Sequence, residues 1–214
     1  MTKSSWIWLI AGVIYAAFFI WYTSFGGPLT EDEIDHYLTK LSESNADATP
    51  DRLASLRRFM EQDTGDDFVM LNVIDMYDQP LQIEGVEPGE SSDDVLAKYM
   101  AYMYPALLSR ACHPIMVGDA AHQALDLMNA PGMENWTRGA LMRYRSRRDM
   151  LEISTNPEFQ GSHDFKIAAM AKTIAFPLDP WFSFGDPRLI LGLVLGMLGM
   201  GLSRWFAGGK AGTD

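Results

Sequence analysis

The chain has little cysteine and little positive charge. Its one cysteine, Cys112, leaves no partner for an internal disulfide and excludes a cysteine-rich metal site. Only 17 of the 214 residues are Lys or Arg, against 28 Asp or Glu, which gives a formal net charge of −11. Because an acidic surface repels phosphates, we expect no binding to nucleic acid.

Charged residues are also missing from both ends of the chain. All but one of the acidic residues, and all but four of the basic ones, lie between residues 25 and 187. Residues 4–30 hold no charged side chain, and a second uncharged run covers residues 189–203. The sequence therefore consists of an acidic centre between two apolar ends.

The first apolar run, residues 6–22, is long enough to form a membrane-spanning helix, since about 20 helical residues cross the hydrocarbon layer. Aromatic residues at its two ends match the interfacial belts of such helices: Trp6, Trp8, Trp21 and Tyr22. A cleaved secretory signal is the alternative, but residues 23–27 offer no good small-x-small cleavage site. We predict a retained transmembrane helix over residues 5–24.

The second apolar run is shorter, but its flanks can extend it. Arg188 and Arg204 can direct their charges toward the membrane interface, and Trp181 and Phe182 precede the run as a candidate aromatic belt. We predict a second transmembrane helix over residues 187–206, which makes the lipid bilayer a partner of the chain.

Glycine is frequent in this second run. Gly192 and Gly196 form a small-xxx-small pair, which lets two helix backbones approach closely. One interpretation is a helix-contact site, either for the first helix or for a neighbouring protein. The other is simple tolerance of glycine in a membrane helix.

Basic residues near the two runs indicate an orientation. Lys3 precedes the first run and Arg204 and Lys210 follow the second, whereas Arg188 argues for the opposite direction. Because basic flanks favour the cytoplasmic side, we predict cytoplasmic termini. In a bacterial inner membrane the central part would then lie in the periplasm.

Residues 30–64 are predicted to form a helical extension at the start of the central part. Thr30 and Glu33 have the spacing of a capping box. Thr49 followed by Pro50 marks a second helix start. Apolar residues at helical spacing follow both starts.

Residues 66–180 are predicted to form a ferredoxin-like domain of the α+β class. The near-continuous apolar run Phe68–Met76 predicts a strand buried on both faces. A helix capped by Asp93 or Asp94 follows, and then two strands and a short helix. After a break at residues 156–159, we expect helical turns over residues 164–172 and a last strand over residues 173–178.

This order, β-α-β-β-α-β, predicts an antiparallel sheet with helices on one face. The bare face must be covered, because soluble domains seldom expose large apolar patches. We therefore expect a homodimer through the sheet face, or contact with other membrane-protein subunits.

Several segments of residues 66–178 resemble a known family. A strand ends in Tyr144-Arg145-Ser146, a Pro157-Glu158-Phe159 break follows, Ala168-Ala169 precede the last strand, and residues 68–72 match a first strand. These residues, with Trp136 ahead of the third strand, resemble the largely uncharacterised dimeric α/β-barrel proteins near the stress-responsive and antibiotic-biosynthesis-monooxygenase-like domains. The resemblance implies a ferredoxin-like fold. Such families include enzymes, binding proteins and many members of unknown role.

Few residues could carry chemistry. His113, at the head of a strand, could accept a proton or bind haem as an axial ligand, with Tyr144 and Arg143 as further catalytic candidates. Alternatively, His113 is satisfied by a backbone carbonyl. Asn72 is a polar residue in an apolar strand that could orient a ligand or hold a loop. The histidine spacing indicates no metal site, and haem is the one cofactor considered.

Arginines cluster near the third strand, at positions 143, 145, 147 and 148. One interpretation is an anion-binding pocket that includes Arg145 and lies near Tyr144. The alternative is ion pairing with the surplus of acid, for example with Asp149 and Glu152.

Two functions remain open from the sequence. The first is an accessory or scaffold subunit of a membrane assembly, favoured by the two apolar ends and by the lack of a catalytic motif. The second is a small-molecule-binding or oxygenase-like enzyme of the α/β-barrel type, tethered to the membrane.

Overall fold

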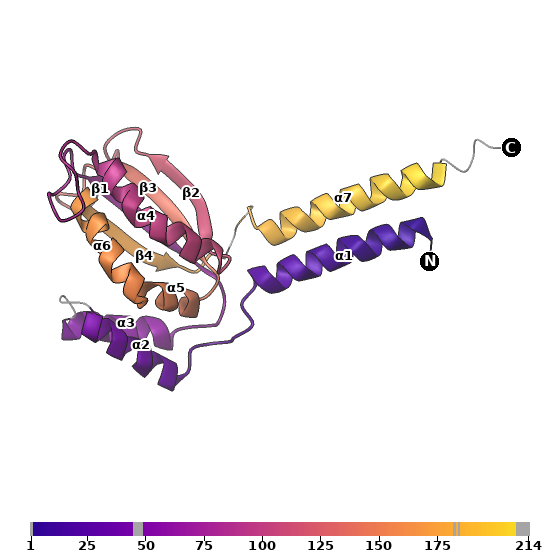
Figure 1. The fold of residues 1–214 in the computed structure, drawn as a ribbon, viewed down its shortest axis with the longest axis horizontal. Helices are drawn as coiled ribbons and strands as arrows, with labels where there is room; N and C mark the ends of the chain where they lie inside the picture. The colour runs from indigo at the N-terminus through magenta and orange to yellow at the C-terminus, as the bar shows by residue number, and fades with distance from the viewer. Residues whose placement is uncertain (1, 45–48, 182, 184, 209–214) are drawn as a thin grey trace. The chain divides into compact units, whose positions relative to one another are not determined.

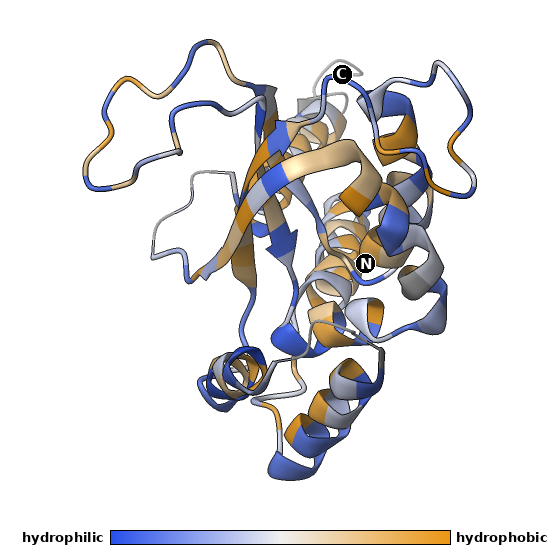
Figure 2. Cartoon of the chain, turned by 90° about the vertical axis from the view of Figure 1, so that its left-hand side faces the viewer, coloured by the Kyte–Doolittle hydropathy of each residue, from blue (hydrophilic) through white to orange (hydrophobic). Residues whose placement is uncertain are grey.

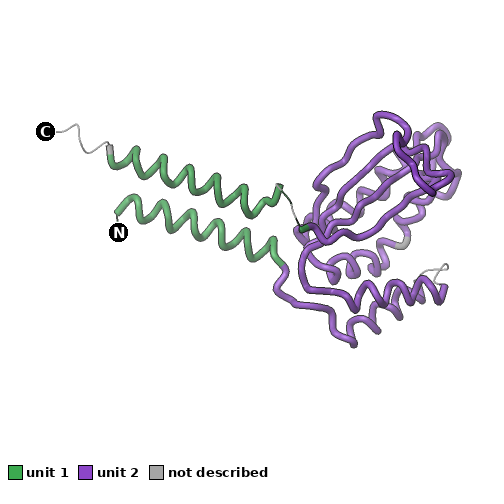
Figure 3. The backbone as a smooth tube through the Cα atoms, turned by 180° about the vertical axis from the view of Figure 1, so that it is seen from behind, with its two compact units in different colours: residues 1–23, 181–214 green, residues 24–180 purple. Residues whose placement is uncertain are grey.

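The structure is a computed structural model that describes residues 2–44, 49–181, 183 and 185–208. The chain forms two compact units, which are described separately (Figure 3). One unit consists of the two ends, residues 1–23 and 181–214, and the other of residues 24–180.

The first unit is a pair of long helices, α1 (Lys3–Tyr22) and α7 (Pro187–Gly208), that lie side by side (Figure 1). The start of α1 meets the end of α7, because the Ser4 hydroxyl donates to Ser203 Oγ at 2.9 Å and Lys3 Nζ lies 5.4 Å from the ring centre of Phe206. The helices are therefore antiparallel. By length and composition, each could cross a membrane. Two residues used to predict the belts and the orientation, Phe182 and Lys210, lie outside the described residues.

The second unit contains a four-stranded antiparallel sheet in the order β2-β3-β1-β4. Figure 1 shows the helices that follow β1 and β3 lying against the sheet. The α+β class and the order of elements within this sheet are as predicted. The elements are β1 (Phe68–Met76), α4 (Ser92–Leu108), β2 (His113–Asp119), β3 (Arg138–Tyr144), α5 (Arg147–Ser154), α6 (Pro157–Ala169) and β4 (Met170–Leu178).

The main core lies between the sheet and helices α4 and α6. Val95 and Leu107 of α4 are fully buried there, together with Ala169 at the end of α6. Met142 and Tyr144 of β3 pack against the same cluster, which identifies the face of the sheet that the helices cover. Hydrophobic and hydrophilic residues lie side by side along the helices of this unit (Figure 2), as expected for helices with one buried face.

Two further helices, α2 (Glu31–Ser44) and α3 (Pro50–Glu61), form a smaller core with α5. Ile34, Tyr37 and Met60 are buried against Leu151. The Thr30 backbone N–H donates to Glu33 at 2.8 Å and the Glu33 N–H donates back to Thr30 Oγ1 at 3.3 Å, so this capping box is formed as predicted.

The structure corrects the predicted boundaries around α6. Pro157 does not break the chain there; it occupies the first turn of α6, where its missing N–H would be unpaired in any case. Asn156 caps the helix by accepting from the Glu158 N–H at 2.9 Å. At its other end, the helix stops at Ala169, and β4 begins at Met170 instead of residue 173.

The start of α4 also differs from the expectation. Ser91 is the N-cap, whereas Asp94 is the third helical residue and its carboxylate accepts from the Ser91 N–H at 3.0 Å. Asp94 thus supplies the second half of a capping box and not the cap itself.

Candidate functional site

One side of the sheet carries apolar side chains that no helix of the core covers. Residues paired across antiparallel strands point to the same side. Leu71 pairs with Leu141 and with Phe176, and Leu141 pairs with Met116. These four residues form a row across all four strands, on the side opposite to Met142 and Tyr144.

Neighbouring rows extend the same surface. Val73 pairs with Ile174, and Val69 pairs with Leu178. Met116 is 54% exposed, Phe176 42% and Ile174 38%, although all three are apolar. We call this surface the open face; it comprises Leu71, Val73, Met116, Leu141, Ile174, Phe176 and Leu178, whereas Val69 at its edge is buried.

The open face explains the pattern of β1. A strand apolar on both sides was expected to be buried on both sides, but Leu71 and Val73 are only partly buried. Helices cover one side of β1, and on the other side the described part of the chain leaves Leu71 and Val73 partly accessible while Val69 is buried. The apolar pattern of β1 therefore predicts more burial on this side than the described residues provide.

The sheet separates the residues predicted to form a catalytic pocket. His113 pairs with Arg143, so both lie on the side of the open face. Tyr144 is adjacent to Arg143 in the strand and therefore points to the helical side, where it stacks on Phe68 with ring centres 5.3 Å apart. Asn72 lies on that side as well, and its side-chain amide donates to the Met70 carbonyl oxygen at 3.1 Å. The four side chains do not line one cavity, and their catalytic and ligand-binding roles stay predictions.

Burial sets the protonation of two groups near this strand. Burial raises the pKa of the Tyr144 phenol above its ordinary value, so the hydroxyl stays protonated at neutral pH. Burial also raises the pKa of the Cys112 thiol to about 11. Since the thiolate is the nucleophilic form, this raised pKa makes Cys112 a poor nucleophile at neutral pH. His113 Nδ1 lies 3.0 Å from the Pro114 carbonyl oxygen.

The clustered arginines contact carboxylates. Arg143 is 4% exposed, and its Nε donates to Asp67 at 2.8 Å while one terminal nitrogen donates to the Ala111 carbonyl oxygen at 2.8 Å. Arg145 binds both oxygens of Asp149, at 2.8 and 2.7 Å. These contacts match the ion-pairing interpretation; the anion-binding role of Arg145 is left as a prediction.

Arg147 and Arg148 hold the helical extension against α5. Arg147 lies 3.7 Å from Asp63 and stacks over the ring of Phe59, whose carbonyl oxygen it also contacts. Arg148 donates to Glu33 at 2.7 Å and to the Gly27 carbonyl oxygen at 3.4 Å. The hydrogen bond from Arg148 is the largest of the effects that lower the pKa of Glu33 to about 2.

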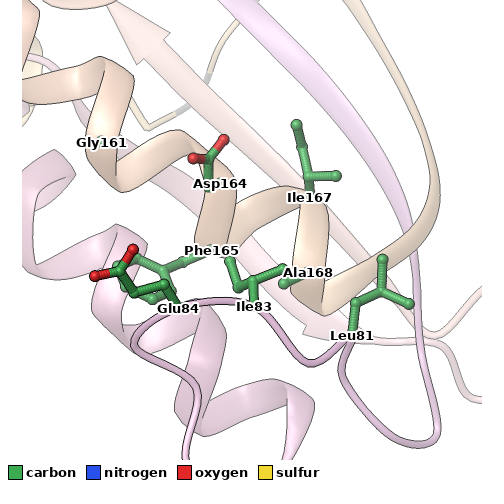
Figure 4. A pocket seen from close by; sticks show the side chains of 8 residues that line it. All are labelled: Leu81, Ile83, Glu84, Gly161, Asp164, Phe165, Ile167 and Ala168. Atoms are coloured by element: carbon green, nitrogen blue, oxygen red, sulfur yellow. The ribbon is translucent and has the colours of Figure 1, made fainter.

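A groove missed by sequence reasoning lies on the outer side of α6 (Figure 4). Its volume is about 340 Å³. One wall is α6 and the other is the loop between β1 and α4, which crosses the helix. The lining residues are Leu81, Ile83, Glu84, Gly161, Asp164, Phe165, Ile167 and Ala168. Over the described residues, no group of three His, Cys, Asp or Glu side chains could hold a metal ion.

The glycines of α7 differ in their surroundings. A Cβ on Gly192 would lie 3.3 Å from the ring of Tyr15, and one on Gly199 would lie 2.9 Å from the ring of Trp8. A Cβ on Gly196 would meet nothing within 4 Å. Among these three glycines, the close approach to α1 therefore uses Gly192 and Gly199, two turns apart, while the role of Gly196 as a helix contact stays a prediction.

Comparison with known proteins supports the fold. No protein-family model matches the chain, and no curated protein matches it. RPA0582, a protein of unknown function from Rhodopseudomonas palustris, is 20% identical with a TM-score of 0.50 over 64% of this chain and 97% of its own. The methylated form of RPA0582 is also 20% identical, with a TM-score of 0.51 over 66% of this chain and 98% of its own. At this identity the likeness shows the fold alone.

A dimeric ferredoxin-like protein of unknown function from Bacteroides fragilis is also similar. It is 14% identical over 53% of this chain and 96% of its own, with a TM-score of 0.32, too low to carry an argument. The strand order β2-β3-β1-β4 and the order of the elements agree with the ferredoxin-like plan expected from the sequence.

Proposed function

We propose that this protein is a membrane-anchored accessory or scaffold subunit whose domain pairs with a second copy through the open face. The single observation that carries the proposal is the row Met116, Leu141, Leu71 and Phe176, apolar across four strands and accessible in one copy. A second copy offers the same chemistry and a matching twist, as a two-fold symmetric interface requires.

The size of the open face sets the expected strength of pairing. Four strands spaced about 4.8 Å apart, over six residues of about 3.4 Å each, cover roughly 400 Å². A standard interface buries about 800 Å² per partner. The face alone therefore predicts weak pairing in dilute solution. Two anchored copies share one membrane, which raises their effective concentration and favours the dimer.

The mass of the full chain in nonionic detergent tests this pairing. Light scattering should give two copies per particle at high protein concentration. Phe176→Asp would place a carboxylate inside the interface, where burial of an unpaired charge is costly, and should weaken dimerisation about tenfold or more.

Leu125→Asp is the matched control. Leu125 is 90% exposed in the loop between β2 and β3, outside the open face, so this variant should pair like the wild type. One copy per particle at every concentration, or a Phe176→Asp variant that pairs as tightly as the control, would contradict the proposal.

We further propose that α1 and α7 both span the bacterial inner membrane, with cytoplasmic termini and with residues 30–180 in the periplasm. The basic flanks of the apolar ends support this orientation. Protease added to spheroplasts with an intact inner membrane should digest residues 24–180. Digestion only after the inner membrane is lysed would reverse the orientation.

A further inference from the structure

The groove on α6 is held open by contacts that do not need a ligand. The Leu81 N–H donates to the Ala168 carbonyl oxygen at 2.9 Å, which fixes one end of the loop to the helix. Lys98 Nζ, on α4, donates to the Gly85 carbonyl oxygen at 2.6 Å, which fixes the other end of this loop segment to α4. Gly85 has φ +84°, and a Cβ there would lie 3.0 Å from the ring of Phe165. The loop thus packs on Phe165 in a conformation suited to glycine.

Gly161 contributes to the width of the groove. It lies inside α6, where glycine costs about 1 kcal/mol relative to alanine. A Cβ at Gly161 would meet no atom within 4 Å. The position therefore has room for a larger side chain, and glycine leaves that room to the groove.

The polar groups of the groove are of one sign. Glu84 and Asp164 are exposed carboxylates that form no ion pair with the described residues. One nearby cation, Lys98, lies 5.7 Å from the ring centre of Phe165 and is held by Glu90 at 2.6 Å. Figure 4 shows Glu84 toward the Gly161 end and Leu81 toward the Ala168 end, so the carboxylates and the aliphatic residues are unevenly distributed along the groove.

We propose that this groove is a binding site for a small organic cation with an apolar body, such as an alkyl- or arylammonium ion. The ammonium group would lie between Glu84 and Asp164, and the apolar body would lie along Phe165, Ile167 and Leu81. A volume near 340 Å³ fits a small molecule of this kind. Both carboxylates are acceptors only, which disfavours an anionic ligand and gives a neutral donor a hydrogen bond without the attraction between opposite charges.

Calorimetry on the full chain in phosphatidylcholine nanodiscs tests the site, with empty nanodiscs as the reference. The probe is the phenethylammonium ion, and 2-phenylethanol is its uncharged counterpart. The cation should bind about tenfold or more tightly than the alcohol, and added salt should reduce the difference. Equal binding of the two probes, or no binding of the cation at millimolar concentration, would overturn the proposal.

Two variants separate the parts of the site. Glu84→Gln with Asp164→Asn should weaken binding of the cation about tenfold and leave the alcohol unchanged. Glu43→Gln with Asp126→Asn removes the same charge from exposed positions elsewhere and should leave the affinity as in the wild type. If both double variants weaken binding equally, only the net charge acts and the site is contradicted.

Gly161→Leu blocks the groove and favours the helix, so the fold is retained while both probes lose affinity. Unchanged binding in this variant would place the ligand elsewhere. The open face lies on the opposite side of the sheet from α6, so this result does not depend on the dimer.

Discussion

At the scale of single residues, arginine side chains show how an acidic domain uses its few cations. Arg145 binds Asp149, four residues on, and this local pair was among those expected from the sequence. Arg143 and Arg148 instead bind Asp67 and Glu33, which are distant in the chain. Sequence spacing finds the local pair but cannot find partners that only the fold brings together.

The pair of Glu33 and Arg148 predicts an acid-dependent loss of stability. The folded pKa of Glu33 is about 2, below its ordinary value of 4.5. A depressed pKa stabilises the fold above about pH 4.5, and this contribution is lost as the pH falls toward 2. Because both side chains are partly exposed, Arg148→Met should remove about 1 kcal/mol of this contribution. Urea unfolding of the full chain at pH 7 and pH 3 measures it.

Lys40→Met, which removes a cation from α2, is the control for this effect. It should keep the wild-type difference between the two pH values. An Arg148→Met variant with an unchanged pH dependence would show that Glu33 does not depend on Arg148.

Gly65 predicts a second effect at this scale. It has φ +84°, and a Cβ there would lie 2.6 Å from the backbone of Gly27. Gly89 has φ +90° with nothing within 4 Å. Gly65→Ala and Gly89→Ala both introduce strain of about 1 kcal/mol, but only Gly65→Ala also forces two backbone segments apart, which costs a further ~1–3 kcal/mol. Equal losses in thermal or urea unfolding would contradict this close approach.

At the scale of elements, the sequence predicted existence and order better than ends. Helix starts were found where a capping pair is local, as for Thr30 and Glu33. The start of α6 was missed because proline at a helix start and proline at a break have the same sequence appearance. For the candidate site, alternation along β3 already places Arg143 and Tyr144 on opposite sides of the sheet. The sequence alone could therefore have separated these two residues.

The contact of α1 and α7 predicts a difference between two glycines of one helix. In a Ser4→Cys, Ser203→Cys background, mild oxidation should form a disulfide, because the two hydroxyls lie 2.9 Å apart and Cys112 is buried. Gly199→Leu should reduce the yield, since a side chain there meets Trp8.

Gly196→Leu is the matched control for that experiment, because its side chain would enter open space. It should leave the disulfide yield unchanged. Equal yields in both variants would show that α1 does not approach α7 at Gly199.

At the scale of the whole molecule, the distribution of charged and apolar residues along the sequence indicates the division into two units more clearly than any motif. The two apolar ends form one unit and the acidic centre forms the other. The groove on α6 could not be predicted, because its walls, the loop near Leu81 and the helix near Ile167, are far apart in the sequence and neither carries a motif. The open face was predictable in outline, since an antiparallel sheet with helices on one side leaves the other bare.

Anchoring by α1 and α7 is the claim on which the proposed location and assembly depend. Extraction of membranes that contain the full chain with alkaline carbonate tests it most directly, because this treatment releases peripheral proteins and leaves spanning ones in the bilayer. We predict that the protein stays in the membrane pellet and enters solution only with detergent. Release into the carbonate supernatant would contradict the account.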